Sequence, residues 1–84
     1  MNVRVRFFAA AREAAGASAL DVDVPTGTTA RGLVSLLGAR CGDRLTRELT
    51  SVGMRIAVNR ELIDDDAVLG HGDEVAFMPP VTGG

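Results

Sequence analysis

The chain has 84 residues, a mass of 8.8 kDa and a formal net charge of −2, which limits it to one small domain. This balance lacks the basic surplus of a protein that binds a phosphate backbone, so we expect no nucleic-acid partner. The single cysteine and single histidine exclude an internal disulfide and a zinc site built from several His and Cys ligands.

The first third of the chain predicts two strands around a short helix. Residues 2–8 alternate apolar and charged side chains, which is typical of a strand with one face in the core and the other in water. The alanine-rich segment 9–15 favours a short helix, and Gly16 follows it where glycine commonly ends a helix. Residues 18–24 alternate again, and a Pro-Thr-Gly turn at 25–27 ends this second strand.

Residues 29–41 predict the main helix, with a threonine at its start whose hydroxyl can cap the first turn. Leu33, Leu36 and Leu37 follow the 3.6-residue period, and we expect all three to pack on the sheet. Residues 43–50 then predict a further short helical segment.

The second half of the chain predicts three short strands. Residues 55–59 and 61–63 form two of them, joined by a tight connection. A turn at 70–73 precedes the last strand at 74–78. Two prolines stop that strand, because proline has no N–H to donate to a ladder.

This element order predicts an α+β domain with a mixed sheet and one main helix packed on one of its faces. At this length the order fits a β-grasp, or ubiquitin-like, roll. A ferredoxin-like arrangement is the alternative, but it needs a second full helix near 64–72, where three aspartates and two glycines argue against one. We expect a single domain over residues 1–78 and an extended tail over 79–84.

Three features that could carry side-chain chemistry have simpler interpretations. The run Asp64–Asp66 could bind a hard cation, but it lacks the spacing of an EF-hand loop, which favours a solvated turn. His71 lies between two glycines and predicts a loop residue. Cys41 falls at the end of the main helix, where a lone thiol usually packs as a small apolar side chain. We therefore expect no metal site and no side-chain catalyst.

The longest apolar run, Phe7–Ala11, is far shorter than the ~20 residues that span a bilayer, and charged residues follow it at once. It is also too short for the core of a signal peptide. Together with the single cysteine, this favours a cytoplasmic protein with no membrane partner.

The end of the chain carries the clearest functional signal. The expected tail consists of Pro79, Pro80, Val81, Thr82, Gly83 and Gly84. The prolines stiffen its exit from the last strand, and the glycines have no side chains, so the backbone can enter a narrow slot. The reactive group would be the α-carboxylate of Gly84, which is unreactive at neutral pH. Another enzyme must therefore activate it, most simply as an acyl-adenylate made from ATP.

Two segments resemble a known family. Residues 7–16 (FFAAAREAAG) resemble the FFA-x-x-RE-x-x-G stretch of the MoaD-type small subunit of molybdopterin synthase. Residues 72–84 (GDEVAFMPPVTGG) resemble the GDEVAF-x-PPV-x-GG ending of the same MoaD/ThiS ubiquitin-like family. Because the segments flank the chain, the resemblance covers essentially all of it. One departure is Met78, where the family frequently has an aromatic residue.

The resemblance implies a sulfur carrier in molybdenum cofactor biosynthesis that is not an enzyme on its own and binds no cofactor. A ubiquitin-activating-type adenylyltransferase would consume ATP to adenylate Gly84, and a sulfur donor would convert it to a thiocarboxylate. The tail would then give its sulfur to cyclic pyranopterin monophosphate in the large synthase subunit, in a complex expected to be a heterotetramer. By position, the expected partner-contacting residues are Phe8, Arg12, Phe77 and Met78.

Other functions remain open for a chain that ends in Gly-Gly. It could carry sulfur for thiamin thiazole or another metabolite, although the two end segments argue against this. It could be a ubiquitin-like modifier that attaches Gly84 to lysines of other proteins, but with no lysine it could not build lysine-linked chains on itself. It could also be a passive interaction module, whose function would survive loss of the two terminal glycines.

Overall fold

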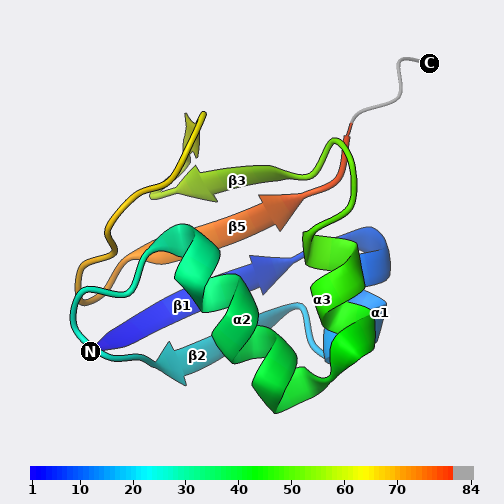
Figure 1. Ribbon diagram of the computed structural model, residues 1–84, viewed down its shortest axis with the longest axis horizontal. Coiled ribbons are helices and arrows are strands. Elements are labelled where there is room, and N and C mark those ends of the chain that lie inside the picture. The colour runs from blue at the N-terminus through cyan, green and yellow to red at the C-terminus, as the bar shows by residue number, and fades with distance from the viewer. Residues whose placement is uncertain (81–84) are drawn as a thin grey trace.

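The structure, a computed structural model, describes residues 1–80 as five strands and three helices (Figure 1). In chain order the elements are β1 (Asn2–Phe7), α1 (Ala9–Ala15), β2 (Ala19–Asp23), α2 (Ala30–Cys41), α3 (Asp43–Leu49), β3 (Arg55–Val58), β4 (Glu61–Ile63) and β5 (Glu74–Met78). The predicted elements are confirmed to within about a residue, with Gly16 in a left-handed conformation at the end of α1. Within residues 1–80 no helix has the length and apolar character needed to cross a membrane.

The strands form one mixed sheet in the order β2-β1-β5-β3-β4 (Figure 1). β1 pairs antiparallel with β2 and parallel with β5, and β3 pairs antiparallel with both β5 and β4. The parallel pair lies at the centre of the sheet, so β1 and β5 begin at one end of the molecule and finish at the other. This arrangement is the predicted β-grasp roll.

α2 crosses one face of the sheet, as Figure 1 shows. The Thr29 hydroxyl accepts a hydrogen bond from the Gly32 N–H at 3.0 Å and caps the first turn, as expected. The buried positions of α2 are Ala30, Leu33, Val34 and Leu37. The expectation for Leu36 is wrong, since this side chain is 39% exposed. At 100° per residue, Leu36 lies roughly 110° around the helix from the middle of the buried stripe.

The core forms between this face of the sheet and the helices. Val3, Val5 and Phe7 point into it from β1, and the intervening side chains stay exposed, as the alternation predicted. The rings of Phe7 and Phe77 stack at its centre with centroids 6.4 Å apart and an interplanar angle of 10°. Both rings are buried, so β1 and β5 are joined by packing as well as by their hydrogen bonds.

Candidate functional site

The site begins where β1 and β5 end side by side. The parallel register pairs Phe7 with Phe77, so Phe8 and Met78, the residues that come next, lie at the same end of the sheet. Neighbouring strands lie about 4.8 Å apart, which brings the two residues close together. Phe8 is 43% exposed and Met78 is partly exposed. Two of the four expected partner-contacting side chains are thus available at one end of the sheet.

The expectation that Phe77 contacts a partner is wrong. Its side chain is 0% exposed and stacks on Phe7, so it cannot contact a partner while the domain is folded. Side chains alternate along a strand, and one of each neighbouring pair must face the core. Phe77 takes the core side and Met78 takes the other.

Arg12 lies one turn into α1 from Phe8. The Phe8 carbonyl accepts hydrogen bonds from the N–H groups of Ala11 at 3.1 Å and Arg12 at 3.4 Å, so the backbone around these residues forms one unit. The Arg12 side chain is exposed, and within residues 1–80 it takes part in no ion pair. Its guanidinium is therefore free to meet an acidic partner group beside Phe8.

A hollow of about 560 Å³ lies where the tail leaves the domain. Its lining consists of Gly53, Arg55, Leu62, Met78, Pro79 and Pro80. Together with Phe8 we call these residues the tail root. Leu62 is 52% exposed, and Arg55 supplies the one cationic group of this lining. The surface can therefore receive an apolar side chain beside a carboxylate.

Sequence reasoning identified the end of β5 but missed the β3–β4 side of the tail root. Leu62 pairs with Ala57 and Arg55 pairs with Met78 across the sheet. Only this register brings the β3–β4 hairpin to the tail, and no pattern in the sequence specifies it. The remaining tail residues, Val81, Thr82, Gly83 and Gly84, lie outside the described residues, and the domain boundary at residue 78 stays a prediction.

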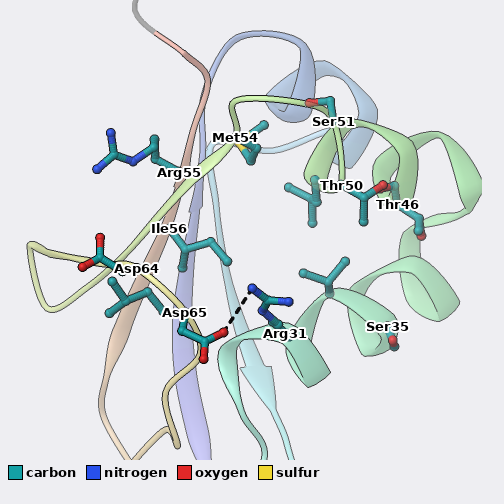
Figure 2. A pocket seen from close by; sticks show the side chains of 13 residues that line it. Arg31, Ser35, Thr46, Thr50, Ser51, Met54, Arg55, Ile56, Asp64 and Asp65 are labelled. Carbon is teal, nitrogen blue, oxygen red and sulfur yellow. Dashed lines mark hydrogen bonds and ion pairs between the residues drawn. The ribbon is translucent and has the colours of Figure 1, made fainter.

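A second hollow, of about 570 Å³, lies on the helix side of β3, and Figure 2 shows it from close by. The Arg31 guanidinium and the Asp65 carboxylate meet across it at 3.3 Å. Ile56 points toward the helices in Figure 2, whereas Arg55 points away from them on the other side of β3. Arg55 lines both hollows and links this groove to the tail root.

The acidic run next to that groove is an exposed turn, as predicted, and it also holds the start of α2. The Asp66 carboxylate accepts hydrogen bonds from the N–H groups of Arg31 at 3.0 Å and Ala67 at 2.9 Å. The Arg31 N–H is the main cause of a lowered pKa at Asp66. In the described part of the chain, no three His, Cys, Asp or Glu side chains lie close enough together to hold a metal ion.

A second polar network lies at the end of the sheet opposite to the tail root. His71 is exposed in the predicted loop, and its Nδ1 accepts a hydrogen bond from the Asn2 N–H at 3.0 Å. The Asp73 carboxylate accepts from the Gly70 N–H at 2.7 Å and from the Asn59 amide at 3.0 Å. These two bonds, the Gly70 bond first, lower the pKa of Asp73. We call these five residues the polar end; their bonds tie together the loops next to β1, β3 and β5.

The chain has a mixed sheet of this order, α2 covers one face of it, and the last strand leads to a Gly-Gly sequence. These features define a ubiquitin-like β-grasp protein. Residues 5–84 match the model of the ThiS family, and the chain belongs to this family. The resemblance drawn from the two end segments is thereby confirmed.

Named relatives align with the chain over nearly its full length. A "molybdopterin synthase sulfur carrier subunit" of Escherichia coli (strain K12) is 42% identical over 84 residues, which cover 98% of this chain and 99% of that protein. A protein of the same name from Drosophila erecta is 40% identical over 87 residues, which cover 100% of this chain and 92% of the relative.

Solved structures show the same fold. A putative molybdopterin converting factor, subunit 1, from Pyrococcus furiosus superposes with a TM-score of 0.82 at 30% identity, covering 96% of this chain and 99% of that one. A chain from the protein–protein complex of subunits 1 and 2 of molybdopterin-converting factor from Helicobacter pylori 26695 superposes with a TM-score of 0.66 at 26% identity. That match covers 100% of both chains.

Proposed function

We propose that this chain is the sulfur carrier subunit of a molybdopterin synthase and that it works with the large subunit of that enzyme rather than alone. The observation that carries the proposal is the Gly-Gly terminus, which follows the last strand of a ThiS-family β-grasp domain. The two full-length relatives named as sulfur carrier subunits support it, and so does the solved complex of two subunits of the converting factor.

The reaction is carried by the Gly84 carboxylate. An adenylyltransferase of the ubiquitin-activating type joins this carboxylate to the α-phosphate of ATP and releases pyrophosphate. A sulfur nucleophile then displaces AMP and leaves a thiocarboxylate. In the large subunit the thiocarboxylate sulfur passes to cyclic pyranopterin monophosphate, and water restores the carboxylate. These reaction steps need no cofactor bound to the chain. We expect the protein to work in the cytoplasm.

The tail root faces the partner during this transfer. Four residues follow Pro80, and a fully extended chain spans at most about 3.3–3.6 Å per residue, so Gly84 can lie no further than roughly 14 Å beyond it. A partner that encloses Gly84 must therefore approach the domain surface around Pro80. Phe8 and Met78 supply apolar contacts there, and Arg12 supplies a charge beside Phe8. We expect a heterotetramer of two such carriers and two large subunits.

Reconstitution tests the proposal. The full-length chain is converted to its thiocarboxylate and mixed with the large subunit and cyclic pyranopterin monophosphate, and molybdopterin is measured. We expect about two carrier chains to be consumed per molybdopterin, because a dithiolene contains two sulfur atoms. Formation of the thiocarboxylate without any molybdopterin would assign the carrier to another acceptor, such as the thiazole of thiamin.

A further inference from the structure

The turn between α3 and β3 lies against the first residues of the tail. In Figure 1 this turn reaches the end of β5 where the tail begins. The antiparallel register pairs Arg55 with Met78, and two further steps along each strand place Gly53 opposite Pro80. The pairing of β3 with β5 therefore places the turn next to the start of the tail.

Gly53 and Pro80 approach each other closely. A Cβ added to Gly53 would lie 3.0 Å from both Cβ and Cγ of Pro80 and 3.6 Å from its Cδ. Gly53 also has φ +85°, a left-handed conformation that side chains disfavour. Gly72 has the same φ of +85°, but an added Cβ there would meet nothing within 4 Å. The contact with the tail therefore distinguishes Gly53 from a glycine required by its turn alone.

Hydrogen bonds hold this turn in place. The Met54 N–H donates to the Ser51 carbonyl at 3.2 Å, and the Ser51 hydroxyl donates to the Glu48 carbonyl of α3 at 2.7 Å. Val52, at the tip, is 98% exposed and contributes no packing. The surface on which the Pro80 ring rests is thus fixed by a hydrogen bond within the turn and by one from the Ser51 side chain to α3.

We propose that Gly53 is a positioning residue for the carrier reaction: it lets the Pro80 ring seat on the turn and so sets the direction in which the reactive terminus leaves the domain. Proline fixes its own φ near −65°, so a seated ring also fixes the course of the backbone. A methyl group at Gly53 would push the Pro80 ring by a few tenths of an ångström and so change the direction in which the chain continues after Pro80. This inference rests on the proposed function.

Gly53→Ala and Gly72→Ala form a matched pair, since both add a methyl group at φ +85° and only the first meets the tail. Thiocarboxylate formation is measured with the activating enzyme, ATP and a sulfur donor. We expect Gly53→Ala to lower kcat about five- to tenfold with KM within twofold, because misplacing a reacting group by about 1 Å can cost up to ~10²-fold. The docking side chains Phe8 and Met78 are unchanged. Gly72→Ala keeps kcat within twofold.

A double-mutant cycle with Pro80→Gly isolates the contact, because this change removes the three ring atoms that the new methyl group would meet. In the Pro80→Gly background we expect Gly53→Ala to lower kcat no more than Gly72→Ala does. Equal kcat losses for the two alanine variants, or the same Gly53→Ala loss with and without the ring, would overturn the inference. Thermal unfolding of each variant shows that the comparison is made between folded proteins.

A measurement on the free protein separates this inference from the proposed function. We expect Gly53→Ala to shift the amide resonances of residues 81–84, whereas Gly72→Ala leaves them unchanged. Unchanged resonances in both variants would overturn the positioning role of Gly53 whatever the tail reacts with. A wild-type chain that gains no sulfur would instead overturn the proposed function.

Discussion

The two ends of the β1–β5 pair are built from opposite kinds of contact. At the polar end, side chains of Asn59, His71 and Asp73 are satisfied by partners within the domain. At the tail root, Phe8 and Leu62 are 43% and 52% exposed, and Arg55 makes no ion pair within residues 1–80. One end uses its polar groups to close the fold, and the other leaves its side chains exposed at the surface.

The difference shows how a domain this small can serve a reaction without an active site of its own. Its side chains complete a core and a set of loop bonds, and the group that we propose to react is a backbone terminus. Three predictions concern the tail and the strand that leads to it, and a fourth concerns the polar end.

Deletion of Gly83 and Gly84 should abolish sulfur transfer and leave the fold intact. The core of the described domain is built by residues between Val3 and Phe77, and a glycine has no side chain to add to a core. Thiocarboxylate formation and the melting temperature are measured on the same preparation. A shortened chain that keeps its activity would show that the domain acts as a passive interaction module.

Phe77→Ala and Met78→Ala change neighbouring residues on opposite faces of β5. Phe77→Ala leaves a cavity in the core and should lower the free energy of unfolding by about 3–5 kcal/mol. Met78→Ala should cost under about 1.5 kcal/mol, because its side chain is only partly buried. Urea unfolding of both variants measures the difference. Equal losses would contradict the assignment of the two faces.

Phe8→Ala at the tail root should weaken binding to the large subunit about tenfold, since an exposed aromatic at the centre of an interface is worth about 1–2 kcal/mol. Val68→Ala is the matched control, because Val68 is 71% exposed but precedes the polar end and lies away from the tail. Titration calorimetry gives both affinities. If Val68→Ala weakens binding as much as Phe8→Ala does, the tail root is not the docking surface.

At the polar end, acid should remove part of the stability. Hydrogen bonds from Gly70 and Asn59 hold the pKa of Asp73 below its usual value, so the folded protein binds this proton less readily than the unfolded chain. The contribution to stability is therefore complete above the unfolded pKa of about 3.9 and is lost as pH falls below it through the lower folded pKa.

Asp73→Asn removes this titration, so the melting temperature of the variant should fall less steeply than that of the wild type over the same range. Asp64→Asn is the control, because Asp64 is exposed and makes no hydrogen bond or ion pair within residues 1–80. An unchanged acid slope in Asp73→Asn would mean that its bonds to Gly70 and Asn59 contribute little.

Much of the fold could be predicted because local patterns were strong. Alternation in 2–8, the glycine after α1 and the prolines after β5 each specify an element or its end. β5 itself shows the limit: four consecutive apolar residues, 75–78, contain no alternation to tell which side faces the core. The wrong expectation for Phe77 follows from this, and only pairing with β1 resolves it.

The candidate site was predicted where it is continuous in sequence and missed where it depends on register. Gly-Gly and the prolines are adjacent along the chain, so their role could be inferred from residue chemistry alone. Gly53 and Leu62 reach the tail root only through the pairing of β3 with β5 and β4. Such long-range contacts are not encoded in any short segment.

In the proposed function the Gly84 carboxylate is the reactive group. Intact-mass and peptide mass spectrometry after incubation with the activating enzyme, ATP and a sulfur donor tests it most directly. We expect replacement of one oxygen by sulfur, located on the C-terminal peptide. No mass change, or a whole sulfur atom added at Cys41 as a persulfide, would contradict it.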